Sequence, residues 1–247
     1  MKTLTKKTIQ FDQLMKVFKK FVSTESYRPV LQLVKFDGKY FTATNSHIIL
    51  RVNAEYVTDF PENLNDEFLY DPKENTVKQM QNNYPETDRI IEQGFYTDSA
   101  ISLNNNNIKE LHKAVKEAKR AAKTNKTIEL NFKPSYLEVT GECLLTKEFK
   151  SLYGKNYKDK FKEISEREQE EITPSEYKTK LEEIASNGDK VNLLLSKSYI
   201  DTALTTVKKL SKLSKDQVNL HIDNGLRPVT FKQENVFDLL VMPVRNK

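Results

Sequence analysis

Apolar residues recur at intervals of three and four in three segments of the chain, the spacing that predicts amphipathic helices. These segments are residues 11–22, 108–123 and 197–213. Asn107 and Ser196 precede the last two segments, where a side-chain oxygen can accept from a free backbone N–H of the first helical turn. We therefore expect three helices, each with one buried face.

Runs rich in β-branched and aromatic residues follow each expected helix and predict strands. The pairs Asp37-Gly38 and Asn224-Gly225 and the step Lys133-Pro134-Ser135 are turn signals between some of these runs. Helices that lead into hairpins favour an α+β fold in which helices pack on one face of antiparallel sheets. The expected strands are 30–36, 40–44, 47–53, 126–131, 136–139, 217–222, 228–231 and 237–244.

Two segments do not follow this pattern. Residues 58–83 are polar and rich in turn formers, and residues 150–190 are dominated by lysine and glutamate. We expect neither to contribute much to the core, and we expect 163–171 to form a solvated helix or a mobile insertion. The chain then divides into a reduced N-terminal domain, 1–85, and a C-terminal domain, 86–247, with its charged insertion near 150–190.

Composition limits the class of protein. A chain of 247 residues that is 37% hydrophobic can fill a core and suits one large domain or two ordinary ones. The single cysteine, Cys143, forms no internal disulfide, which fits a reducing compartment, and it excludes a Cys-rich zinc module. No signal peptide or membrane-spanning run is evident. We expect a soluble, cytoplasmic protein that does not contact a membrane.

Basic residues accompany the apolar faces of all three expected helices. The formal net charge of +5 is too small to indicate nucleic-acid binding by itself, so their placement matters more than their number. Such helices suit contact with the phosphate backbone of duplex DNA, although ordinary solvated lysines would give the same pattern. The candidate DNA-binding residues are Lys16, Lys19 and Lys20; Lys109, Lys113, Lys116, Arg120 and Lys123; and Lys208, Lys209 and Lys212.

Catalytic and metal-binding patterns find little support. The three histidines have no metal-ligand spacing, and His47 beside Ser46 lies outside any nucleophile-elbow motif. Six glycines form no phosphate-binding loop. We expect no catalytic residue, no metal and no cofactor, and an enzyme with an unrecognised site is the least favoured hypothesis.

Two motifs, in this order, resemble signature segments of the bacterial DNA sliding clamp, the DNA polymerase III beta subunit. The first runs from Arg28-Pro29-Val30-Leu31 to Ala43-Thr44-Asn45-Ser46-His47, and the second is Val241-Met242-Pro243-Val244-Arg245. Residues 84–91 and 191–247 are similar to the linker and the last part of such clamps. The resemblance implies a DNA-clamp-like fold and a non-enzymatic polymerase processivity factor that holds replication proteins on duplex DNA.

The resemblance also implies where partners bind. In clamps the two motifs meet in an apolar pocket for short peptides of DNA polymerase and other replication proteins. Taken singly, Ile49, Val241 and Val244 could equally be ordinary core residues of strands. Carried over by position, one wall would hold Leu31, Thr44, Ser46 and Ile49 with His47 at the rim, and the other Val241, Met242, Pro243 and Val244.

The chain departs from the family in length and in detail. Bacterial clamps have three domains per chain and close as dimers, whereas this chain is expected to lack the first domain. Ile48 follows His47 where the family has arginine, and Asn45 replaces aspartate. A homo-oligomeric ring, trimer or dimer, remains one hypothesis, with a phage or mobile-element origin as one interpretation. The alternative is a clamp-derived adaptor or inhibitor that binds replication proteins without encircling DNA.

Overall fold

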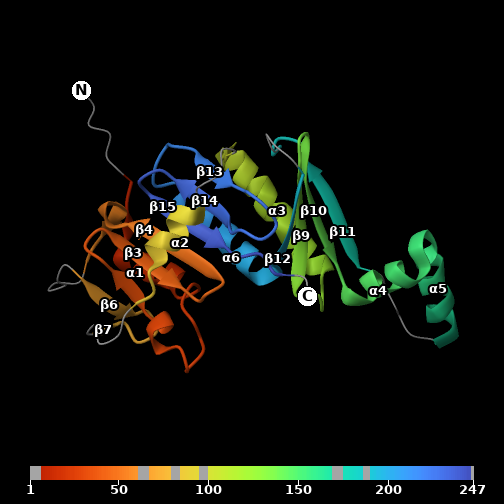
Figure 1. Cartoon of the computed structure of the whole chain (residues 1–247), viewed down its shortest axis with the longest axis horizontal. Coiled ribbons are helices and arrows are strands. Elements are labelled where there is room, and N and C mark those ends of the chain that lie inside the picture. Colours follow the sequence, from red (N-terminus) through yellow and green to blue (C-terminus); the bar gives the residue numbers. More distant parts are fainter. Residues whose placement is uncertain are drawn as a thin grey trace.

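Antiparallel sheets and amphipathic helices build the molecule (Figure 1). The computed structural model describes residues 7–60, 67–78, 84–94, 100–168, 175–185 and 190–245. The N-terminal elements are β1 (Ile9–Gln10), α1 (Phe11–Phe18), the 3₁₀ helix η1 (Pro29–Gln32), β2 (Val34–Phe36), β3 (Tyr40–Thr44), β4 (Ile48–Asn53), η2 (Ala54–Tyr56), β5 (Val57–Thr58), β6 (Phe68–Asp71) and β7 (Thr76–Lys78).

The rest of the chain repeats a strand–helix–three-strand unit twice. A short helix, α2 (Thr87–Gly94), precedes the two units. The first unit is β8 (Ala100–Leu103), α3 (Asn105–Ala121), β9 (Thr127–Lys133), β10 (Tyr136–Glu142) and β11 (Glu176–Leu181), with α4 (Leu144–Tyr153), η3 (Gly154–Asn156) and α5 (Tyr157–Glu168) inserted before β11. The second unit is β12 (Val191–Ser196), α6 (Lys197–Leu210), β13 (Val218–His221), β14 (Val229–Gln233) and β15 (Phe237–Val241).

Strand pairing joins the two ends of the chain in one sheet. A nine-stranded sheet has the order β7-β6-β2-β3-β4-β15-β14-β13-β8, and a four-stranded sheet has the order β11-β10-β9-β12. Strands β4 and β15 pair antiparallel, from Val52 opposite Phe237 to Ile48 opposite Val241. We call this junction the β4–β15 seam. It brings the two sequence motifs together although they lie about two hundred residues apart in the chain.

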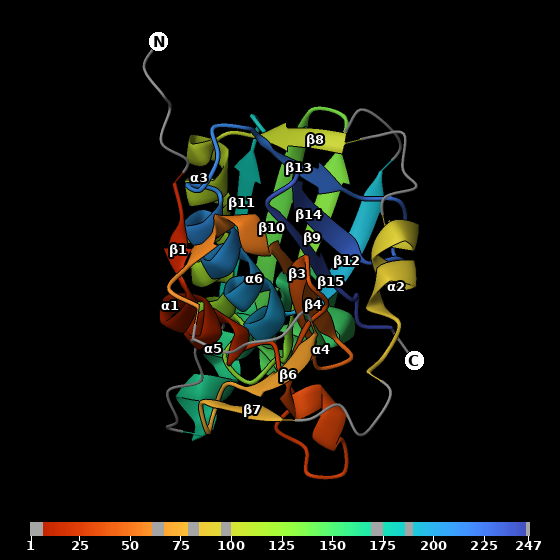
Figure 2. The ribbon, with the colours of Figure 1, turned by 90° about the vertical axis from the view of Figure 1, so that its left-hand side faces the viewer.

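Helices α1, α3 and α6 cover one face of the sheets, and α2 lies on the opposite side (Figure 2). Alternate residues of the seam separate these sides, because successive side chains of a strand point to opposite faces. Ile48 and Val241 belong to the large core beneath the three helices, whereas Ile49 and Leu240 form a small separate cluster with Ile91 of α2. We call these two sides the helix face and the outer face.

One approach in the helix layer is unusually close. A Cβ atom added to Gly141 of β10 would lie 2.0 Å from the backbone oxygen of Ala118 in α3. Only glycine permits this approach of helix to strand. The close packing presses α3 onto the four-stranded sheet and fixes the height of the helix above it.

The expected helices are present with different boundaries. The first ends at Phe18, because the amides of Lys20 and Phe21 bond to carbonyls three residues back and tighten the chain into a turn. The second begins at Asn105, where Asn104 is the cap and Asn107 is its reciprocal partner in a capping box. The expectation that Asn107 is the cap was therefore wrong by three residues.

The third helix ends at Leu210 rather than at residue 213. Ser196 occupies the N-cap position but makes no side-chain capping bond, and its hydroxyl lies 3.0 Å from the hydroxyl of Ser198 instead. Helix α2 was not expected from the sequence, because its eight residues are too few for a clear periodic pattern.

Three expectations about strands and the core were wrong. Residues 30–33 form η1 and the turn after it rather than a strand, because Pro29 fixes a helical φ at its first position. In the segment 58–83, β6 buries Phe68, Leu69 and Tyr70, and in the segment 150–190, α5 buries Phe161. The apolar run of β6 is only three residues long, and Phe161 is an isolated aromatic residue in a charged segment, so neither gave a clear periodic pattern. Residues 61–66, 79–83, 169–174 and 186–189 of these segments lie outside the described residues.

Candidate functional site

A groove of about 680 Å³ lies on the outer face of the β4–β15 seam. Strands β3 and β4, helix α2, the turn before β14 and the segment after β15 surround it. Such a concave, partly apolar space is typical of sites for small molecules and peptide side chains. Its lining residues are Thr44, Ser46, Ile49, Ile90, Gln93, Arg227, Pro228 and Met242.

A tight β3–β4 turn shapes one wall of the groove. Ser46 has a positive φ of 75°, and the Asn45 side chain accepts from the amides of His47 and Ile48 at 3.0 and 3.1 Å. The hydroxyl of Thr44 donates to the Ile48 carbonyl at 2.9 Å. Asparagine suits this turn because its short side chain satisfies nearby backbone amides. The turn thereby positions Thr44 and Ser46 in the groove lining.

The pairing register of β4 with β15 places Met242 in the groove lining. Its amide donates to the carbonyl of His47 at 2.9 Å, which extends the pairing of β15 beyond its last strand residue. Because alternate residues share a face, Met242 lies on the same side as Leu240, while Val241 is fully buried beneath the helices. The flexible thioether of Met242 gives the groove an adaptable apolar surface.

Four lining residues were not expected from the sequence. Ile90 and Gln93 come from α2, and Arg227 and Pro228 come from the turn before β14. The adjacent isoleucines at 90 and 91 in an otherwise polar segment were the one local signal, because one of them is buried and the other is 40% exposed. Nothing local in the sequence marks Arg227 and Pro228, which reach the groove through sheet topology.

Two of the expected groove residues are instead part of the core. Leu31 lies in η1 and is nearly buried, and it is not part of the described lining. Val241 is fully buried on the helix face. Thr44, Ser46, Ile49 and Met242, in contrast, are brought together as expected.

Three other expected groove residues lie beside the groove. The His47 ring stacks on Tyr199 with 5.3 Å between centroids, and His47 is not part of the described lining. Pro243 forms a bridge with Leu195, and the amide of Val244 donates to the Leu194 carbonyl at 2.7 Å. The tail after β15 therefore continues along the edge of β12 instead of folding into the groove.

The expected basic residues are all exposed on α1, α3 and α6 or directly after them. Burial and then the charges of Lys16 and Lys20 lower the pKa of Lys209, so α1 and α6 bring their lysines close together. The Lys209 ammonium donates to the Gln13 carbonyl at 3.3 Å. We call the exposed cations of these three helices the basic face.

His112 connects the basic residues of α3 and α6. Burial and then Lys116 lower its pKa, Asp201 opposes them, and Lys208 lowers it further. Lys116 and Lys208 therefore flank the same imidazole from two helices. Acids neutralise part of the face, because Asp201 lies 2.6 Å from the Lys119 ammonium and Glu117 pairs with Arg120.

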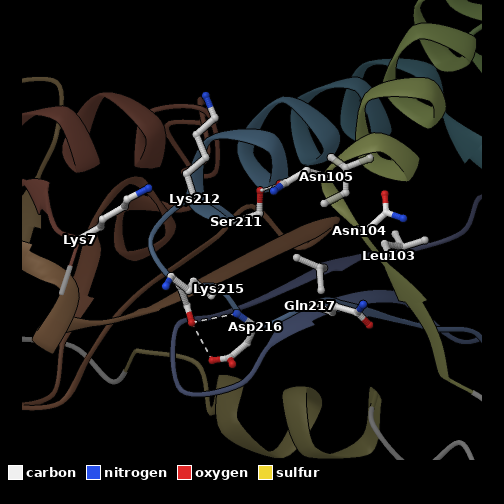
Figure 3. A pocket seen from close by; sticks show the side chains of 12 residues that line it. Lys7, Leu103, Asn104, Asn105, Ser211, Lys212, Lys215, Asp216 and Gln217 are labelled. Carbon is white, nitrogen blue, oxygen red and sulfur yellow. Dashed lines mark hydrogen bonds between the residues drawn. The ribbon is translucent and has the colours of Figure 1, made fainter. Parts of the chain in front are cut away.

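A second cavity, of about 380 Å³, lies where α3 begins and α6 ends. Figure 3 shows Lys7, Lys212 and Lys215 on one side of it and Asn104 and Gln217 on the other. The cavity thus adds lysines at one end of the basic face. Within the described residues, no helix is long and apolar enough to cross a membrane, and no three His, Cys, Asp or Glu side chains gather as metal ligands.

Burial of the Lys209 amine, together with repulsion from Lys16 and Lys20, predicts a stability effect. Because its folded pKa is lowered, the charged amine opposes folding at neutral pH, and this cost disappears above the unfolded lysine pKa of about 10.4. We expect Lys209→Gln to raise Tm by roughly 1 to 3 °C at pH 7 in low salt, with no gain above about pH 10.5. Thermal unfolding by circular dichroism measures this, with exposed Lys155→Gln as control. A lower Tm for Lys209→Gln in low salt would contradict the repulsion.

Comparison with known proteins identifies the fold. No protein-family model and no curated protein matches the sequence. Among solved structures, the DNA polymerase sliding clamp of Bacillus subtilis is similar with a TM-score of 0.64 and 19% identity, over 96% of this chain and 63% of that one. The beta subunit of Streptococcus pyogenes DNA polymerase gives a TM-score of 0.60 and 17% identity, over 95% and 64%.

The sliding clamp of Pseudomonas aeruginosa is also similar, with a TM-score of 0.62 and 12% identity over 95% of this chain and 65% of that one. The chain thus spans slightly less than two thirds of the length of these clamps. At such identities the likeness concerns the architecture of the backbone. The fold of this chain is the bacterial DNA-sliding-clamp fold, an α+β arrangement of antiparallel sheets with helices on one face.

Proposed function

We propose that this protein is a clamp-like processivity factor whose basic face contacts duplex DNA and whose groove holds a peptide of a replication protein. The observation that carries the proposal is the placement of these two features on opposite sides of the β4–β15 seam. A molecule of this kind tethers a partner on its outer face while its helices contact DNA. The similar structures are a DNA polymerase sliding clamp and a DNA polymerase beta subunit, which supports the same role.

The proposed DNA contact rests on the positive charge of the basic face, which would bind phosphates without reading the base sequence. Lysines and arginines displace condensed counterions from phosphates, and such contacts carry no base information. Burial is the main cause of the lowered pKa values of Lys209 and His112, but lysines of the neighbouring helices contribute to both, and an anionic backbone would relieve that repulsion. Individually weak contacts of this type would permit sliding.

The peptide part rests on the chemistry of the groove. Ile49, Ile90, Pro228 and Met242 supply apolar surface, and Thr44, Ser46 and Gln93 supply hydrogen-bonding groups around it. Arg227 is held by Asp223 at 2.8 Å at the same site. An apolar groove with a few polar groups suits a short segment of DNA polymerase or another replication protein that inserts aliphatic or aromatic anchors.

Encirclement of DNA would require several copies. The described sheets end at β7 and β8 and at β11 and β12, and the tail after β15 lies along β12. Strands β7 and β11 are two unlike edges that a neighbouring copy could pair with. Head-to-tail joining of unlike edges closes a ring when the rotation between copies completes a circle. We propose a homotrimer, with a dimer as the other closed form.

A second candidate function is a clamp-derived adaptor or inhibitor that binds replication proteins without encircling DNA. The N-terminal part favours it, because only one strand–helix–three-strand unit, β1-α1-β2-β3-β4, is present among its described residues, against two in the C-terminal part. A shortened N-terminal part with a complete groove would still capture a peptide.

Charge reversal on the basic face should weaken DNA binding. We expect the triple variant Lys16→Glu, Lys116→Glu, Lys208→Glu to bind a labelled 30-base-pair duplex at least about tenfold more weakly at low salt. The slope of log K against log salt should fall in magnitude by about 0.9 for each phosphate that the variant no longer neutralises. Fluorescence anisotropy across a salt series measures both. The matched control reverses exposed Lys155, Lys158 and Lys190, and equal weakening in the two triple variants would refute a specific DNA face.

A charge in the groove should abolish peptide capture. We expect Ile90→Glu to weaken binding of a fluorescein-labelled hexapeptide with leucine and phenylalanine anchors by at least about tenfold, because a carboxylate cannot share the apolar lining. Leu152→Glu on α4 is the control, since Leu152 is also an exposed aliphatic residue. Unchanged affinity in Ile90→Glu, with binding by the unaltered protein, would place the peptide elsewhere.

Solution mass distinguishes the two candidate functions. Light scattering across protein concentrations, with and without duplex DNA, should give about three times the chain mass of 28.7 kDa for the trimeric clamp, or twice it for a dimeric one. A monomer under every condition, with peptide binding intact, would instead favour the adaptor.

A further inference from the structure

Helix α2 is a wall of the groove, and an apolar contact holds part of it on the sheet. Ile49 of β4 pairs across the seam with Leu240 of β15, and Ile91 of α2 is fully buried against them. This contact fixes the height of the helix above the outer face. Thr87, the first residue of α2, is also buried, so burial holds the helix on the sheet at two positions that are one turn apart.

An ionic contact supplies a further attachment point of a different kind. The next outward-facing pair along the seam is Arg51 opposite Asp238, and Arg51 Nη1 lies 2.8 Å from Asp88 Oδ1 of α2. Asp88 and Ile91 are three residues apart, so they share one face of the helix. Ile49 and Arg51 are two residues apart, so they share one face of the strand. The helix therefore engages two adjacent cross-strand pairs at once.

The guanidinium of Arg51 is itself held on several sides. Its Nε and Nη2 lie 2.7 and 2.6 Å from Asp238 Oδ2, and its central carbon lies 4.6 Å from the centre of the Tyr40 ring. Arginine presents its donors in a rigid planar fork that also stacks on aromatic rings. Because these contacts fix the fork, Arg51 defines a set position for Asp88.

The side chains that Arg51 contacts differ in their exposure to solvent, and this difference indicates which contact matters for global stability. Burial raises the pKa of Asp238 although Arg51 opposes it, and the side chains of Arg51 and Asp238 are only 16% and 9% exposed. Asp88 is 57% exposed. Removal of Arg51 would leave a buried carboxylate without its partner, whereas an exposed ion pair contributes little to global stability. Asp88 can therefore be substituted with little effect on global stability.

We propose that Arg51 and Asp88 are positioning residues for the groove, and that their ion pair sets where Ile90 and Gln93 stand in its lining. The inference rests on the proposed peptide-binding role of the groove. Neither Arg51 nor Asp88 belongs to the described lining, so an effect on peptide binding would reach the groove through α2.

The test is Asp88→Asn in the full chain, with Glu92→Gln as the matched control. Both substitutions remove one exposed carboxylate from α2, but no described ion pair involves Glu92. We expect Asp88→Asn to weaken binding of the leucine–phenylalanine hexapeptide about fivefold and to speed amide hydrogen exchange of residues 87–94 about tenfold, with Tm within about 2 °C. The peptide affinity and exchange rates of Glu92→Gln should remain within about twofold of those of the unaltered protein. Asp88→Glu, which keeps a carboxylate at this position, should retain most of the peptide affinity.

A double-mutant cycle separates the ion pair from a general effect of acid near the helix N-terminus. Arg51→Lys keeps the charge beside Asp238 but removes the fork, so Asp88→Asn should have a much smaller effect in that background. Equal effects in both backgrounds, or unchanged exchange in Asp88→Asn, would overturn the proposal. If the unaltered protein binds no peptide, the proposed groove function fails, while the exchange rates of residues 87–94 still decide whether the pair positions α2.

Discussion

The antiparallel pairing of β4 with β15 is the constraint on which the rest of the structure depends. It joins five consecutive residues of each strand and makes one sheet from the two ends of the chain. Since side chains alternate, this register decides which residues face the helices and which face α2. A shift by one residue would send Leu240 into the helix core and turn Met242 away from the groove. The same shift would separate Arg51 from Asp238.

The seam also keeps two kinds of chemistry apart. On the helix face, α1, α3 and α6 gather positive charge, and burial together with neighbouring lysines lowers the pKa values of Lys209 and His112. On the outer face, α2 rests on the seam through Ile91 and Asp88 and completes an apolar groove. A processivity factor needs this separation, because the partner that it tethers must not compete with DNA for one surface.

The sequence predicted those helices and groove residues that a local periodic pattern or motif marks. It did not predict the features that depend on how distant strands pair. Long amphipathic segments predicted α3 and α6, and the resemblance brought Thr44, Ser46, Ile49 and Met242 to one groove. Because side chains alternate along β15, Val241 faces the helix core instead of the groove. Pro243 and Val244 lie beside the groove because the tail after β15 pairs with β12. Helix α2 and strand β6 were missed because each is too short for its pattern to emerge from polar sequence.

The most direct test of the account is whether DNA and peptide bind one molecule at the same time. Anisotropy of the labelled hexapeptide can be titrated with protein in the absence and in the presence of saturating unlabelled duplex. Binding on opposite faces predicts a peptide Kd that is unchanged within about twofold and a larger final anisotropy in the presence of DNA. Displacement of the peptide by DNA would mean that both bind one surface, and it would contradict the assignment of the two faces.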